Sequence, residues 1–171
     1  MAFYRRKLPH LQRDNQRHFV TVCTLQRWIL PQAARAIVLE CCRYDNDVRH
    51  FLHAVVVMPD HAHVIFTVLI NSQKAEFYSL AEVMGRIEGA SAQLINRELD
   101  RQGRVWQTES FDPVLRCSES VDAKIVYILE NPVRAGLVPE RTEYQWTWVR
   151  RDSANSAGLR PDGTAQGAVS T

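Results

Sequence analysis

Apolar and β-branched residues recur in the pattern of strands in three stretches of the chain. These stretches run from His18 to Leu25, from His50 to Met58 and from His61 to Val68. Only Pro59-Asp60 separates the last two stretches, and a link this short allows only an antiparallel pair. The pattern therefore predicts three strands, of which the second and third are joined by a tight turn.

Three other stretches repeat apolar residues every three or four positions, which indicates helices with one buried face. Ser79 and Glu82 form a capping box at the start of the second helix. Pro132 disfavours a helical conformation at Asn131, so the third helix is expected to end there. The expected helices span about 31–44, 80–100 and 119–130, with apolar faces of Ala34, Ile37, Val38, Cys41 and Cys42, of Leu80, Val83, Met84, Ile87, Leu94 and Ile95, and of Val121, Ile125 and Ile128.

The resulting order is β-α-β-β-α, then an irregular or strand-like segment over 106–116, then a helix. This order predicts an α+β fold, a ferredoxin-like or RRM-like sandwich with an antiparallel sheet, helices on one face and a late helix that carries the candidate chemistry. Residues 71–77 are expected to form a loop, and the segment through Trp146 and Trp148 to cap the core. The domain is expected to span 18–149, between a basic arm over 1–17 and a disordered tail over 150–171.

Composition limits the function classes only weakly. A chain of 171 residues with 46% hydrophobic and 23% charged residues suits one globular domain. The net charge of +2 does not by itself indicate a polyanionic partner. Because no apolar run approaches roughly 18 residues and no signal peptide is evident, the sequence predicts a soluble cytoplasmic protein without a membrane partner.

Basic residues are unevenly distributed and crowd the N-terminal arm. Arg5, Arg6, Lys7 and Arg13 lie there together. Such a cluster is most often a solvated arm, but an arm that contacts DNA phosphates has the same composition. Both interpretations remain open at this stage.

The candidate chemistry begins with His61 and His63. Side chains two residues apart on a strand point to the same face, so the two imidazoles can converge on one cation. On the third helix, Tyr127 lies away from the centre of the buried face, Asn131 falls on the same side one turn later, and Lys124 is nearby. Each residue also has a simpler explanation. The histidines could be polar residues at the end of a hairpin, and Tyr127 a half-buried packing residue. Asn131 could end the helix, and Lys124 could be solvated.

The ordered set of motifs resembles the HUH-type single-strand DNA transposases, and within them the REP-associated tyrosine transposases. The residues that carry this resemblance are Met58-Pro59-Asp60-His61-Ala62-His63, Ile95-Asn96-Arg97, Val105-Trp106-Gln107, Ser110-Phe111-Asp112, Tyr127 and the run from Asn131 to Val138. Together these motifs extend over nearly all of 18–148. As an ordered set these motifs are specific to the family, whereas each motif alone is weak evidence for it.

The resemblance implies that His61, His63 and Asn131 hold Mg²⁺ or Mn²⁺ and that Tyr127 attacks a DNA phosphate to form a 5′-phosphotyrosine. The implied substrate is single-stranded DNA beside a palindromic hairpin, with the basic arm and Lys124 as possible DNA contacts. The implied enzyme is a bacterial, nucleoid-associated endonuclease and strand transferase. It would be a monomer or a homodimer. In a homodimer, Tyr127 could act with the histidine pair of its own subunit or with that of the partner subunit.

The sequence differs from the family's usual pattern in two places, and two other functions remain open. Glu88 stands where the family tends to have a lysine, and the sequence after Trp148 also departs from the family. A non-catalytic, domesticated hairpin-binding protein would share the fold. A metal hydrolase that uses water would need a carboxylate base, and Asp60 is the only acid beside the histidines. Outside this set, His53 is interpreted as a packed or hydrogen-bonded residue, and Trp106 as a core residue rather than a base-stacking one.

Overall fold

A four-stranded antiparallel sheet forms the centre of the computed structural model, which describes residues 17–108 and 121–151. The strand order is β1-β3-β2-β6, formed by Arg17–Cys23, His61–Val68, His50–Val57 and Thr147–Val149. The tight turn after Met58 joins β2 to β3, as expected. The α+β class with an antiparallel sheet is confirmed.

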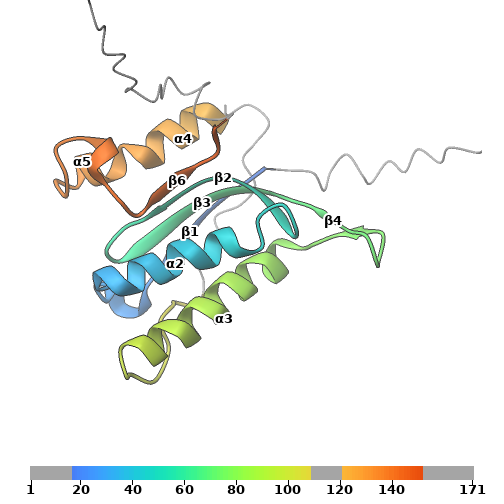
Figure 1. The fold of residues 1–171 in the computed structure, drawn as a ribbon, viewed down its shortest axis with the longest axis horizontal. Coiled ribbons are helices and arrows are strands. Elements are labelled where there is room, and N and C mark those ends of the chain that lie inside the picture. The colour runs from blue at the N-terminus through green and yellow to red at the C-terminus, as the bar shows by residue number, and fades with distance from the viewer. Residues whose placement is uncertain (1–16, 109–120, 152–171) are drawn as a thin grey trace, which may run out of the picture.

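Helices cover both faces of this sheet (Figure 1). The long helices α2 and α3 pack side by side on one face, and the shorter α4 lies on the other. Their bounds are Gln32–Tyr44, Leu80–Glu98 and Val121–Leu129; the remaining short elements are η1 (Leu25–Arg27), β4 (Ile70–Asn71), β5 (Glu76–Phe77), α5 (Asn131–Arg134) and η2 (Arg141–Glu143). Among the residues described, no helix is both long and apolar enough to cross a bilayer.

Strand alternation divides the buried residues into two clusters. Along β3, Val64 and Phe66 point toward α2 and α3, whereas Ile65 points toward α4. The cluster beneath α4 consists of Ala54, Val56, Met58, Ile65, Val121, Ile125, Ile128, Leu129 and Tyr144. The central strands are therefore buried on both faces, which explains their nearly continuous apolar sequence.

Two segments differ from the sequence-based expectations. Trp146 and Trp148 do pack against the core, but the segment also adds β6, an edge strand that pairs with β2. The expected loop over 71–77 contains a small hairpin, β4–β5. The basic arm through residue 16, residues 109–116 of the irregular segment, the first two residues of the third helix and the tail from 152 lie outside the described residues.

The predicted capping box at the start of α3 is present. The Ser79 hydroxyl accepts from the Glu82 N–H at 3.1 Å, and the Glu82 carboxylate accepts from the Ser79 N–H at 2.7 Å. We expect Ser79→Ala to lower the free energy of unfolding by about 1 kcal/mol, because the helix loses a partner for its first free amides. Urea denaturation of Ser79→Ala beside Ser72→Ala, an exposed serine outside any helix, measures this. An equal effect of both substitutions would contradict the prediction.

Candidate active site

His61 and His63 point to the sheet face that α4 covers. They share this face with Ile65, which packs in the cluster beneath α4. Their ring centroids lie 4.7 Å apart, with the ring planes at 78°. The side chain of His61 is 20% exposed, whereas His63 is 8% exposed. The two imidazoles therefore form a close pair at the boundary between core and solvent.

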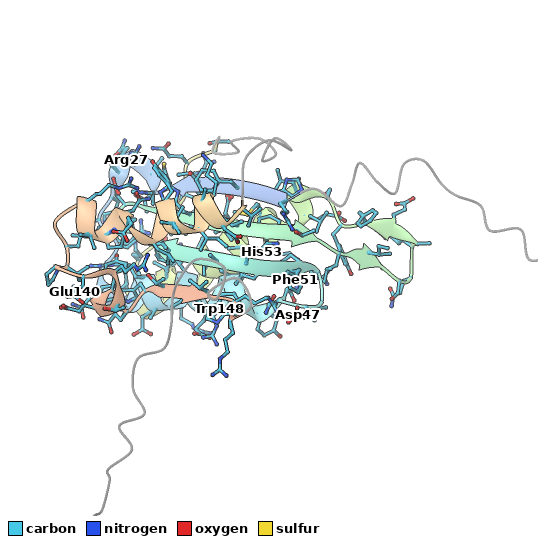
Figure 2. All side chains as sticks on the ribbon, turned by 90° about the horizontal axis from the view of Figure 1, so that it is seen from above. Arg27, Asp47, Phe51, His53, Glu140 and Trp148 are labelled. Atoms are coloured by element: carbon cyan, nitrogen blue, oxygen red, sulfur yellow. The ribbon has the colours of Figure 1, made fainter. Side chains whose placement is uncertain are left out.

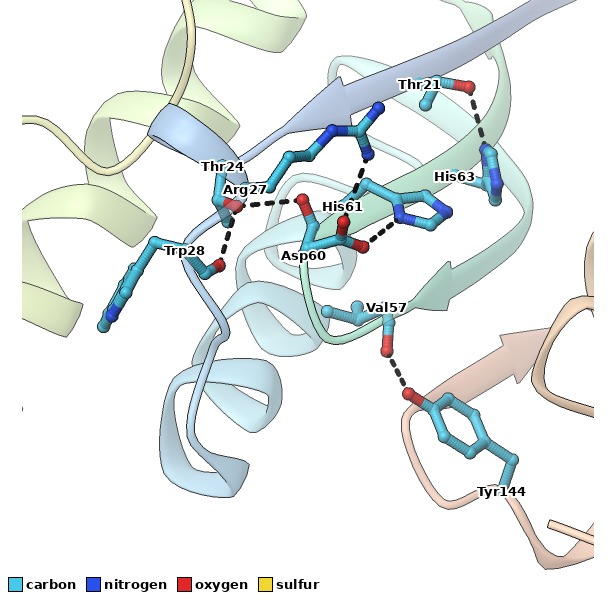
Figure 3. Close-up of polar contacts among 9 residues, drawn as sticks. All are labelled: Thr21, Thr24, Arg27, Trp28, Val57, Asp60, His61, His63 and Tyr144. Atoms are coloured by element: carbon cyan, nitrogen blue, oxygen red, sulfur yellow. Dashed lines mark hydrogen bonds and ion pairs between the residues drawn. The ribbon is translucent and has the colours of Figure 1, made fainter. Parts of the chain in front are cut away.

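Asp60 holds the His61 ring (Figure 3). The Asp60 carboxylate lies 2.7 Å from Nδ1 of His61 and 3.3 Å from the Arg27 guanidinium. Partial burial opposes ionisation, but the hydrogen bond and charge of His61, together with Arg27, outweigh it and lower the pKa of Asp60. An ionised carboxylate only accepts hydrogen bonds, so Nδ1 of His61 donates. With Nδ1 as the donor, Nε2 is the nitrogen of this ring that can ligate a cation.

Thr21 and Phe19 of β1 hold the His63 ring. The Thr21 hydroxyl lies 2.8 Å from Nδ1 of His63 (Figure 3). Phe19 stacks on the same ring at a centroid distance of 5.5 Å. Burial, followed by the nearby charges of His61 and Arg134, lowers the pKa of His63 to about 3. At neutral pH this ring is uncharged, which is the form that binds a metal.

Helix α4 runs along the sheet toward the histidine pair. Near its start, Asp122 acts electrostatically on His53, and beyond its end Arg134 acts on His63. Figure 2 shows the sheet along its length, with Phe51 of β2 toward one end and Arg27 at the other. Arg27 pairs with Asp60, so its end of the sheet is the end that carries the histidine pair. The last turn of α4 therefore lies at the histidine end of the sheet.

Tyr127 lies in this last turn and is 47% exposed. Lys124, one turn earlier, lies 5.6 Å from the centroid of the Tyr127 ring and 5.2 Å from that of Phe19. Phe19 in turn stacks on His63. A chain of ring and cation contacts thus connects the tyrosine to the histidine pair, and the Tyr127 side chain is outside the apolar cluster.

Asn131 opens the short helix α5 directly after α4. Pro132 fits the first turn of α5, because backbone N–H groups there have no partner within the helix and the missing N–H of proline costs no hydrogen bond. The expected end of the third helix at Asn131 is therefore a junction between two helices rather than a stop. Across this junction, Arg134 donates to the side-chain oxygen of Asn131 and, at 2.8 Å, to the backbone oxygen of Tyr127. Its guanidinium carbon lies 4.3 Å from the centroid of the Tyr127 ring.

The donor set of this region fits a divalent cation. Nδ1 of both histidines has a partner, which orients the rings as metal-ligating histidines usually are oriented. Within the described ranges, no group of three or more His, Cys, Asp or Glu residues could hold a metal, so among these residues a third protein ligand would be of another type. The amide oxygen of Asn131 accepts from Arg134 and retains a second lone pair.

The remaining candidates lie elsewhere or have structural partners. His53 is 8% exposed, with its Nε2 2.9 Å from the Thr67 hydroxyl, and Trp106 is 5% exposed and donates to Ser91. Both arrangements agree with the interpretation of these residues as packing residues. A cavity of about 900 Å³ between α2 and α3 lies away from the histidine face. The basic residues of the arm, Arg5, Arg6, Lys7 and Arg13, lie outside the described residues.

Glu88 lies on α3, on the sheet face opposite the histidine pair. Burial raises the pKa of Glu88 to about 7, and its buried Oε1 atom has no hydrogen-bond partner within the part of the chain that the structure describes. Because α3 and the histidines lie on different faces, this carboxylate does not face a phosphate held by the histidines. Its effect is instead expected in the stability of the fold.

Glu88 should make the fold less stable as the pH rises. Because its pKa is higher in the folded chain than in the unfolded chain, its contribution is complete below about pH 4.5 and is lost as the pH rises through about 7. We expect Glu88→Gln to gain stability relative to the wild type between pH 5 and pH 8, on the order of 1 kcal/mol after allowance for solvent screening. Denaturant unfolding at both pH values measures this, and a difference that does not change with pH would contradict it.

The comparisons with known proteins agree with this fold. The family model described as "Transposase IS200 like" matches residues 12–129, so the chain belongs to the IS200-like transposase family. A solved REP-associated tyrosine transposase bound to a REP hairpin matches over 100% of both chains, with 19% identity and a TM-score of 0.63. A candidate transposase from Deinococcus radiodurans matches with 20% identity and a TM-score of 0.46, over 77% of this chain and 97% of that one. No curated protein matches significantly.

These comparisons confirm the resemblance at the level of family and fold. The family model extends over most of the motifs that carry the resemblance, including the histidine pair and Tyr127. At 19% identity, the likeness to the hairpin-bound transposase shows a common fold. The roles of the individual site residues remain predictions.

Sequence reasoning missed Thr21 and Arg134 as members of this site. Thr21 is paired with His63 across the β1–β3 ladder, and only the strand register could reveal this. Arg134 lies seven positions after Tyr127 and three after Asn131, which is the spacing of one helical face. Pro132, which precedes Arg134 by two residues, predicts a turn instead, and this expectation obscures the helical spacing.

Proposed function

We propose that this protein is a metal-dependent endonuclease and strand transferase that cleaves single-stranded DNA beside a hairpin. Tyr127 would be the nucleophile, and His61, His63 and Asn131 would hold Mg²⁺ or Mn²⁺. The proposal extends the family assignment, which indicates a DNA-cleaving and strand-transferring enzyme, to a particular chemistry and set of residues.

One observation carries this proposal. An exposed tyrosine lies in the last turn of α4, over the same sheet face that presents two imidazoles with their Nδ1 atoms already bonded. A packing tyrosine would not need this exposure, and a simple binding surface would not need two oriented imidazoles. A phosphodiester needs a nucleophile on one side and positive charge at its non-bridging oxygens, and this arrangement can supply both.

The proposed step balances as a transesterification. The phenolic oxygen of Tyr127 forms a bond to phosphorus as the bond from phosphorus to the 3′ oxygen breaks. The phenol releases one proton to solvent, and the departing 3′ oxygen takes one up. The products are a 5′-phosphotyrosine and a free 3′-hydroxyl. Attack by another 3′-hydroxyl on this linkage rejoins the DNA and regenerates the phenol.

The bound cation would supply positive charge that neutralises the phosphate oxygens as negative charge builds up. The protein contributes orientation: Asp60 and Thr21 fix the two imidazoles, and α4 carries Tyr127 over the same face of the sheet. Lys124 and the basic arm are proposed DNA contacts outside the reacting bond.

A palindromic hairpin is the proposed substrate. It is suggested by the likeness in fold to a transposase that was solved bound to a REP hairpin. A natural substrate would be a repeated palindrome with a short single-stranded flank. The protein is proposed to act as a monomer or homodimer at the bacterial nucleoid.

The direct test uses an oligonucleotide with a palindromic hairpin and a flanking tetranucleotide, labelled at its 3′ end. Incubation with the full chain and Mn²⁺ should transfer the label to a protein–DNA adduct that survives denaturing electrophoresis. The released strand should end in a 3′-hydroxyl that a polymerase can extend. Omission of the divalent ion, or addition of EDTA, should prevent both products.

The alternatives predict different products. A non-catalytic, domesticated hairpin-binding protein would show salt-dependent binding without any adduct under every metal tested. A metal hydrolase would cut the DNA without a covalent intermediate. Either result would overturn the proposed function.

A further inference from the structure

We propose that Arg134 binds a non-bridging oxygen of the scissile phosphate while Tyr127 attacks. This inference rests on the proposed function and adds a residue to it. It also supplies the site with a fixed positive charge that belongs to the protein.

Three contacts place the Arg134 guanidinium beside the candidate nucleophile. Its carbon lies 4.3 Å from the centroid of the Tyr127 ring, and Nη2 donates to the backbone oxygen of Tyr127 at 2.8 Å. Nη2 also donates to the side-chain oxygen of Asn131. One side chain thus contacts both members of the catalytic set that come from the α4–α5 junction.

The same guanidinium lies over the Tyr127 ring, and Tyr127 belongs to α4, the helix on the sheet face that presents the histidine pair. A phosphate attacked by Tyr127 and neutralised at the histidine pair must lie between these two groups. Arg134 therefore lies next to the position where negative charge develops.

The chemistry of arginine suits this position. A guanidinium presents five N–H donors in a plane and remains charged at any physiological pH. Only Nη2 is used by Tyr127 and Asn131, and among the described residues no hydrogen bond is made by Nε or Nη1. These donors can bind phosphate oxygens while Nη2 keeps its partners.

The backbone around Arg134 is fixed by a hydrogen bond and a tight turn. Arg134 is the last residue of α5, and its N–H donates to the Glu130 carbonyl at 2.9 Å. Gly136 then turns the chain with a φ of +68°, a conformation that most other residues adopt only with strain. With the backbone fixed and Nη2 bonded to Tyr127 and Asn131, the guanidinium is held in place before substrate binds, as effective electrostatic catalysis requires.

A purely structural role would also explain the contacts, since Arg134 joins α4 to α5. The two roles differ in how they respond to the phosphate itself. If the guanidinium offsets the charge of a non-bridging oxygen, removing that charge should make Arg134 dispensable. If Arg134 only holds the helices, the phosphate chemistry should not matter.

The experiment compares Arg134→Ala with the wild type on two hairpin oligonucleotides. One carries the normal scissile phosphate, and the other carries a methylphosphonate there, in which an uncharged methyl replaces one oxygen; each stereoisomer is assayed separately. On the normal phosphate, we expect the rate of adduct formation to fall by at least about 100-fold. On one methylphosphonate stereoisomer, the difference between variant and wild type should shrink to less than about threefold.

Matched variants separate the possible outcomes. Arg141→Ala removes a neighbouring arginine that pairs with Glu130 at 3.2 Å, and should leave both rates unchanged. Arg134→Lys keeps the charge and should recover part of the rate. An Arg134→Ala penalty that is equal on the normal phosphate and on both methylphosphonates would overturn the phosphate contact. Absence of any wild-type adduct would instead overturn the proposed function.

Discussion

Replacing Tyr127 by phenylalanine should lower the rate of adduct formation by at least about 1000-fold. The substitution removes the attacking oxygen and nothing else. The ring can still pack against Arg134, whose guanidinium carbon lies 4.3 Å from its centroid. Because the side chain is 47% exposed, the fold should lose little stability. Denaturing electrophoresis of the labelled hairpin measures the adduct, and fluorescence anisotropy measures hairpin binding, which should be retained.

Tyr44→Phe is the matched control for this substitution. Tyr44 is 82% exposed and ends α2, on the opposite side of the sheet. Its loss of a hydroxyl should leave adduct formation unchanged. Persistence of the adduct in Tyr127→Phe would show that another residue is the nucleophile.

Replacing His63 by alanine should reduce cleavage by at least about 100-fold and weaken Mn²⁺ binding. The substitution removes a neutral imidazole whose orientation is fixed by Thr21 and Phe19. Thr21→Val keeps the ligand but loses the hydrogen bond to Nδ1, so its effect on Mn²⁺ affinity should be smaller, about tenfold. Calorimetric titration with Mn²⁺ measures the affinity without relying on activity.

His53→Ala provides a matched histidine control. His53 is as buried as His63, lies nearer the other end of the sheet and contacts Thr67. Its substitution should cost stability but leave Mn²⁺ binding intact. If His53→Ala and His63→Ala weakened Mn²⁺ binding equally, the histidine pair would not be the metal site.

Local sequence patterns were sufficient to predict the sheet centre. The ranges expected for β2 and β3 agree with the observed strands to within one residue, because β-branched runs and a short Pro-Asp link leave few alternatives. Strand alternation also predicted that His61 and His63 would share one face, and the structure has them 4.7 Å apart. Such features depend only on neighbours in the sequence.

Features that depend on distant pairing could not be predicted in the same way. Strand β6 has only three residues, and it pairs with Val55 and its neighbours far earlier in the chain. The bond between Thr21 and His63 depends on the register of β1 against β3. Arg134 is hard to predict for another reason: Pro132 predicts the end of the helix, although a second short helix, α5, follows at once.

The pairing of β6 with β2 has a consequence for synthesis of the chain. Thr147 to Val149 supply the hydrogen-bonding partners for the outer edge of β2, around Val55. Until these residues leave the ribosome, a strongly apolar strand keeps an open edge, which other chains can recognise. We expect C-terminal deletions that reach Thr147 to yield insoluble protein, and nascent chains of that length to depend on chaperones.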